Sequence, residues 1–112
     1  MARTFEGCPP GYHAAYAEII GHLRSLGAVH EDAVQVGVFL KTDRKLAEIR
    51  PKPRSLELCL YLPRRIQHAR ISRHIPISAD RTVNIVKLHT ADDVDEQVLD
   101  WLTEAHLDAT DR

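Results

Sequence analysis

The segment VQVGVFLKTDRKLAEIRPKPRSLELCLYL, residues 34–62, decides the fold that this chain is expected to adopt. Polar residues at 42–45 and a proline-rich stretch at 51–54 divide it into three parts, and proline cannot donate a ladder hydrogen bond. Alternate positions of the outer parts are apolar: Val34, Val36, Val38 and Leu40, then Leu56, Leu58, Leu60 and Leu62. This period of two predicts an antiparallel three-stranded meander with one apolar face.

The middle strand, Leu46 to Arg50, has an ambiguous pattern because Leu46 lies out of phase with Ala47 and Ile49. We expect Ala47 and Ile49 to face the core, with Glu48 and the strand's last residue on the opposite face.

Upstream, apolar residues at helical spacing predict a helix from Pro10 to Leu26, which Gly27 ends in a left-handed conformation. Residues 28–32 are expected to be a connector. Downstream, residues 71–77 alternate weakly around Pro76 and suggest an edge strand.

Residues 82–88 predict a further strand with Val86 and Leu88 inward. The segment Thr90–Asp93 resembles a capping box, and a second helix is expected to follow it and to end near Leu107. Residues 108–112 are expected to fray.

The expected order is α-β-β-β-β-β-α in one domain, residues 1–112. Two amphipathic helices and one apolar sheet face predict an α+β two-layer sandwich, with an antiparallel sheet and both helices on one face. Six residues are expected to be buried together: Ile19, Leu23, Leu58, Leu60, Val98 and Leu102.

Composition narrows the class of protein. The 112 residues include 44% hydrophobic and 28% charged residues, which is typical of a globular domain. No apolar run predicts a membrane span, and residues 1–7 lack the apolar core of a signal peptide, so we expect a cytoplasmic protein without a membrane partner. Cys8 and Cys59 are expected to be free thiols.

Charge is strongly polarised along the chain, although the net charge is only −1. Residues 41–87 carry twelve basic and four acidic side chains, whereas residues 88–112 carry eight acids and Arg112. The acids of the second helix are expected to lie on the far side of the helical layer, which would leave the basic block uncancelled.

These elements resemble a small family of uncharacterised bacterial domains, found alone or appended to larger proteins, some of restriction-modification type, and loosely labelled predicted transport protein. The resemblance covers nearly the whole chain and implies the fold, but it brings no catalytic residues. It rests on Pro9-Pro10, Leu26-Gly27, Lys41, the stretch from Ala47 to Arg54, the alternating leucines Leu56 to Leu62, and the last helix around Leu99, Trp101 and Ala105.

Patterns that would indicate an enzyme are weak. The seven histidines show no zinc-ligand spacing, so no metal or cofactor is expected. Asp43 with Glu48-Ile49-Arg50 only approximates a nuclease motif. Cys59 would have Tyr61 and His89 as neighbours on the outer face, but the sequence shows no environment that would lower the pKa of its thiol. We therefore expect a non-enzymatic binding module.

The expected working surface is the basic outer side of the sheet, where aromatic rings could stack on bases and cations could neutralise phosphates. Its candidate partners are nucleic acid or an acidic protein. Alternatives are a surface paired within the chain, a homodimer that buries Phe39, Cys59 and Tyr61, or a small-ligand pocket between sheet and helices. The candidate anion-binding residues are Phe39, Lys41, Arg50, Tyr61, Arg64, Arg65 and Lys87.

Overall fold

A computed structural model describes Phe5 and residues 7–110. In chain order the elements are α1 (Pro10–Leu26), β1 (His30–Val34), β2 (Gly37–Lys41), β3 (Lys45–Pro51), β4 (Leu56–Leu62), β5 (Ile71–Ser78), β6 (Arg81–Leu88), the short 3-10 helix η2 (Ala91–Asp93) and α2 (Glu96–Ala109).

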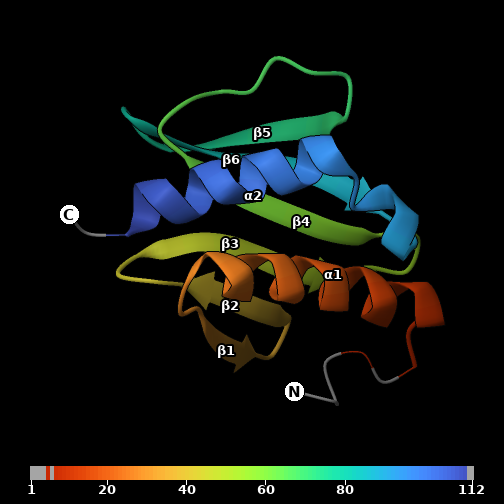
Figure 1. The fold of residues 1–112 in the computed structure, drawn as a ribbon. Helices are drawn as coiled ribbons and strands as arrows, with labels where there is room; N and C mark the ends of the chain where they lie inside the picture. Colours follow the sequence, from red (N-terminus) through yellow and green to blue (C-terminus); the bar gives the residue numbers. More distant parts are fainter. Residues whose placement is uncertain (1–4, 6, 111–112) are drawn as a thin grey trace.

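The six strands form one antiparallel sheet in the order β1-β2-β3-β4-β6-β5. Both helices lie side by side across one face of this sheet, called here the inner face, and the opposite face is called the outer face (Figure 1). The expected two-layer α+β sandwich with both helices on one face is confirmed.

The core lies between the helices and the inner face, with β4 near its centre. All six residues expected in the core are fully buried, and so are Ala47 and Ile49 of β3. The side chains of Leu56, Leu58, Leu60 and Leu62 all belong to this cluster. The period-two pattern of β4 therefore identified the inner face correctly.

The expectation that the meander begins with one continuous strand is wrong, because this part of the chain forms a hairpin of two strands. His30–Val34 forms β1, Gln35 and Val36 form a turn, and only Gly37–Lys41 continues as β2. Val36 is 53% exposed rather than inward-facing. Gly37 is required here, because a Cβ atom at this position would lie 2.0 Å from the carbonyl oxygen of Ile49. The described residues thus form six strands rather than the expected five.

The first helix has the expected bounds, but Gly27 ends it in an extended conformation, with φ 156° and ψ −169°, rather than a left-handed one. Because φ is positive, this combination of φ and ψ is open mainly to glycine.

The second helix starts later and ends later than expected. Thr90–Asp93 caps η2, where the Asp93 carboxylate accepts hydrogen bonds from the backbone N–H groups of His89 and Thr90. The His89 N–H group in particular lowers the pKa of Asp93. Asp95 then caps α2 by accepting from the Val98 N–H at 3.0 Å.

At its end, α2 continues through Ala109, which is fully buried, so the fraying expected from position 108 is wrong for Asp108 and Ala109. Positions 111 and 112 lie outside the described residues, as do most of residues 1–7. No helix in the described part of the chain is long and apolar enough to span a membrane.

Asn84 fixes the long connection between β4 and β5 to the inner face. Its side-chain oxygen accepts from the Ile66 N–H at 2.9 Å, and its amide nitrogen donates to the Arg64 carbonyl at 3.1 Å. His74 contacts the Ile66 carbonyl through Nε2 at 2.8 Å. This loop carries arginines that reach α2.

Replacing Leu60 with alanine is expected to lower the free energy of unfolding by about 2–5 kcal/mol, because it removes a fully buried side chain and leaves a cavity. Urea denaturation followed by circular dichroism measures the change. Leu107→Ala is the matched control, since Leu107 lies on α2 but is 59% exposed, and it is expected to change stability by less than about 0.5 kcal/mol. Equal losses in the two variants would contradict the assignment of the core.

Candidate anion-binding face of the sheet

Neighbouring strands bring three rows of side chains together on the outer face. The pairing registers align Phe39, Glu48, Cys59 and Ile85 in the first row. The second row consists of Arg50, Glu57 and Lys87. The third consists of Tyr61, Val83 and Ile75. The outer face is therefore a mixture of charged, aromatic and aliphatic groups.

Two carboxylates are buried in this face and are paired with guanidinium groups. Arg50 Nε lies 3.4 Å from Glu48 Oε2, and Arg73 Nη2 lies 3.6 Å from Glu57 Oε1. Arg50 Nε and Glu57 Oε1 are buried without a hydrogen bond, so both pairs are electrostatic contacts of poor hydrogen-bond geometry. Because a carboxylate already compensates Arg50, this arginine contributes less positive potential than its sequence position suggests.

Lys45 is a residue of the outer face that the sequence did not indicate. Its Nζ atom lies 3.9 Å from the centre of the Phe39 ring and 5.9 Å from that of Tyr61, which are cation–π contacts. Lys45 was assigned to the polar turn, but β3 begins at this residue and its side chain lies over the outer face. The sequence could have indicated this contact between a cation and two aromatic rings only if β3 had been predicted to begin at Lys45.

Tyr61 is half-buried and its hydroxyl donates to Glu48 Oε1 over 3.4 Å. Burial raises the pKa of Tyr61 to about 12, with the Glu48 carboxylate adding to the effect. The Tyr61 side chain is therefore neutral, and its ring lies beside Lys45.

The remaining predicted residues do not lie on one surface. Lys41 pairs with Asp32 of β1 at 3.4 Å, and Lys87 is exposed beside Glu57. Arg65 is exposed in the loop after β4. Arg64 faces α2 instead, where it forms two hydrogen bonds to Glu104 of 2.7 and 2.8 Å.

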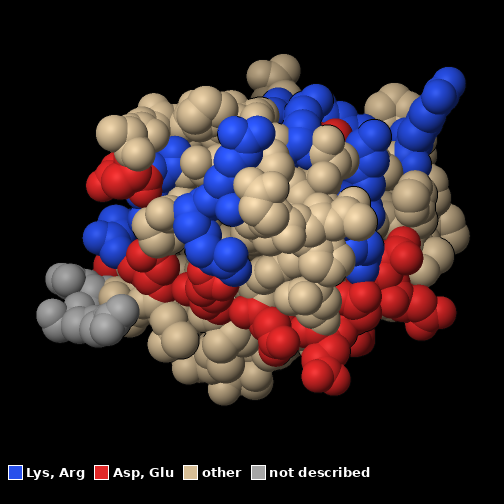
Figure 2. All heavy atoms as spheres, turned by 90° about the horizontal axis from the view of Figure 1, so that it is seen from above, with Lys and Arg blue, Asp and Glu red and all other residues tan. Residues whose placement is uncertain are grey.

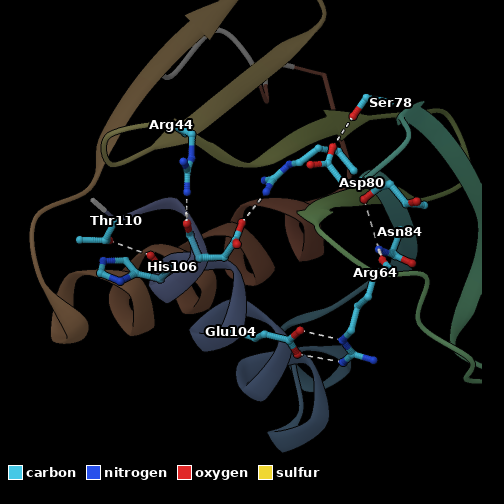
Figure 3. Close-up of polar contacts among 11 residues, drawn as sticks. Arg44, Arg64, Ser78, Asp80, Asn84, Glu104, His106 and Thr110 are labelled. Carbon is cyan, nitrogen blue, oxygen red and sulfur yellow. Dashed lines mark hydrogen bonds and ion pairs between the residues drawn. The ribbon is translucent and has the colours of Figure 1, made fainter. Parts of the chain in front are cut away.

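The expectation that the acids of the second helix lie far from the basic block is wrong. Figure 3 shows Arg64 facing Glu104 and Arg44 reaching the end of α2. In addition, Arg70 pairs with Asp95 at 2.8 Å and Arg81 pairs with Asp108 at 2.7 Å. The acids at the flank of α2 can reach these arginines because the neighbouring sheet edge and the loop before β5 lie beside the helix. Part of the basic block is thus compensated within the chain.

The charges that remain after this pairing are still separated. Among the described residues, six basic side chains form no ion pair with a carboxylate, and all belong to strands or to loops between strands: Arg44, Lys45, Lys52, Arg54, Arg65 and Lys87. The acids Glu18, Asp92, Glu96 and Asp100, which lie on the helices, likewise form no ion pair, and neither does Asp80 in the turn between β5 and β6. Figure 2 shows the outcome: blue Lys and Arg side chains gather on one part of the surface, and red Asp and Glu side chains form a band along its lower border.

The enzyme-like alternatives find little support in the geometry. Cys59 is 3% exposed, and its burial, together with Glu48 and Glu57, raises the pKa of the thiol to about 12. A thiol in this environment is a poor nucleophile. Asp43 lies in the turn before β3, and Glu48 is engaged by Arg50.

Two of the histidines make contacts that hold packed elements together. His22 contacts Thr103 between the two helices at 2.8 Å, and the ring of His68 packs edge-on against Trp101. In the part of the chain that the structure describes, no three His, Cys, Asp or Glu side chains are grouped so that they could hold a metal ion.

Fold and surface together define a small α+β domain with a positively charged sheet side and an acidic helix side. The chain belongs to the family described as Domain of unknown function (DUF5655), whose family model matches residues 1–109. No curated protein and no solved structure matches the chain. The membership agrees with the resemblance to an uncharacterised domain family and supplies no activity.

Thiol labelling tests the buried position of Cys59. With a thiol-reactive dye at pH 8, Cys8 is expected to react rapidly because it is partly exposed, whereas Cys59 is expected to react only as the domain unfolds. Spectrophotometric counting of labelled thiols, with and without denaturant, measures both. A rapidly reacting thiol in the Cys8→Ser variant would contradict this assignment.

Proposed function

We propose that this domain is a non-enzymatic, cytoplasmic module that binds a polyanion, with nucleic acid as the leading partner, through the outer face and the strand loops beside it. One observation carries the proposal: among the described residues, the basic side chains left without an ion pair lie on strands and strand loops, whereas the acids left without one lie mainly on the helices, with Asp80 in the turn between β5 and β6 as the exception. A near-neutral protein can thereby attract a polyanion to one side.

The aromatic rings favour nucleic acid over an acidic protein. Lys45 lies over Phe39 and close to Tyr61, so a phosphate that draws the ammonium group away would uncover the ring of Phe39 for a base. Stacking on such rings contributes about 1–3 kcal/mol per base and tolerates any sequence. Single-stranded nucleic acid is therefore expected to bind better than a duplex, whose bases are already stacked.

Arg64 is not part of the proposed surface, because its guanidinium is held by Glu104.

Neutralising Lys45 and Lys87 tests the surface. The double variant Lys45→Gln, Lys87→Gln is expected to bind labelled single-stranded DNA and RNA at least tenfold more weakly at low salt. Its log–log salt dependence should be shallower by about 1.4, since each lost phosphate contact removes about 0.7 for single strands. Fluorescence anisotropy at several salt concentrations measures both quantities.

The matched control is Ala14→Glu, Ala17→Glu on the exposed side of α1, which changes the net charge by the same amount but away from the sheet. It is expected to bind nearly as wild type. No binding by wild type at low salt, or equal losses in both double variants, would overturn the proposal. Stronger binding of a polyglutamate peptide than of the oligonucleotides would assign the face to an acidic protein.

A homodimer is a second candidate function, because the third row of the outer face is apolar and reaches the sheet edge. Tyr61, Val83 and Ile75 are neighbours on β4, β6 and β5, and Ile75 is 42% exposed on the edge strand. Cys59 is already buried by its own chain, so it would not contribute to the interface as expected. A second copy could cover this row by a two-fold arrangement.

Sedimentation equilibrium over a range of concentrations tests the dimer. Wild type is expected to associate, and Tyr61→Glu is expected to shift the equilibrium toward monomer, because it places a charge in the apolar row. The control Ala17→Glu introduces the same side chain on α1 and should leave association unchanged. A wild-type chain that stays monomeric at every concentration would remove this candidate.

A further inference from the structure

A cavity of about 540 Å³ lies away from the rows of the outer face, where the ends of both helices approach the first hairpin. The end of α1 and the residues after it form one wall, and the last turns of α2 and the end of β2 form the others. Its volume falls within the range of small-molecule sites. The lining includes Leu26, Ala28 and Val29 on the apolar side and Lys41, Thr42 and His106 on the polar side.

His106 is the observation that points to a ligand. This side chain is only 7% exposed, yet its Nε2 atom is buried without a hydrogen-bond partner. It faces the end of α1, since a Cβ atom at Gly27 would lie 3.7 Å from Nε2. Buried polar atoms in proteins are nearly always paired. The Nε2 atom of His106 has no partner among the described residues and lies against Gly27, and both residues line the cavity, so a partner could reach it from there.

Hydroxyl groups and a cation complete the polar wall. The Thr110 hydroxyl lies 2.7 Å from the His106 carbonyl and 3.3 Å from the Thr42 hydroxyl, which joins α2 to the end of β2 (Figure 3 shows Thr110 beside His106). Lys41 lines the same cavity, and only the half-exposed Asp32 compensates it, at 3.4 Å. The Lys41 ammonium group and an N–H at His106 Nε2 are both donors that suit an oxyanion.

We propose that this cavity binds a small molecule that carries one oxyanion group, a carboxylate or a phosphate, on an apolar body. The oxyanion would accept from Lys41 and from His106 Nε2, and the body would cover Leu26, Ala28 and Val29. Lys41 is thereby assigned to this pocket rather than to the polyanion surface.

Titration with benzoate, phenyl phosphate and the neutral analogue benzamide, followed by ¹H–¹⁵N NMR of the full chain, tests the proposal. Benzoate or phenyl phosphate is expected to shift the backbone amides of Gly27, Thr42 and Thr110 saturably, with a millimolar Kd typical of a small fragment. The stronger of the two identifies the oxyanion class. Benzamide is expected to bind at least tenfold more weakly.

Three variants locate the binding. His106→Phe keeps an aromatic ring but removes Nε2, and Lys41→Gln removes the cation; each is expected to weaken binding at least tenfold. Ala28→Phe fills the cavity from its exposed rim and should abolish the shifts, whereas Ala17→Phe adds the same ring on exposed α1 and should leave them unchanged. No saturable shift with either anion, or binding by Ala28→Phe equal to wild type, would overturn the proposal.

Discussion

The apolar inner face of β4 is the constraint on which the rest of the molecule depends. β4 lies between β3 and β6, so both of its edges are hydrogen-bonded and its leucines point to one side. Burying that side requires two helices, because one helix is too narrow to cover a sheet of this width. Removing water from this interface supplies most of the free energy that opposes chain entropy.

The charge distribution follows from the same constraint. Since α1 and α2 turn their apolar stripes to the sheet, their acidic residues must lie at the flanks of the helical layer or face the solvent. The flanking acids Asp95, Glu104 and Asp108 meet arginines from neighbouring sheet elements. The solvent-facing acids meet none of the described arginines or lysines, so a nearly neutral chain keeps an acidic side and a basic side.

The two proposed binding regions have different physical characters. The outer face is broad, partly apolar and solvated, which suits an extended polymer that displaces counterions. The cavity near His106 is concave and has an orphaned polar atom, which suits one small ligand. Lys41, at the end of β2, lines the cavity, and we assign it there rather than to the polyanion surface that the sequence indicated.

By itself the sequence determined the fold class, α1, the inward residues of β3, β4 and β6, and the polarity of charge along the chain. These features depend on periodicity and composition, which are local. The hairpin at Gln35-Val36 escaped detection because its turn lacks the Gly, Asn or Asp that usually marks one, and Val34–Leu40 alternates without a break. Only the tertiary structure decided the pairing of Arg64 with Glu104, the place of Lys45 over Phe39, and the cavity beside His106. Each depends on the distance between elements far apart in the chain, which packing sets and a linear pattern does not contain.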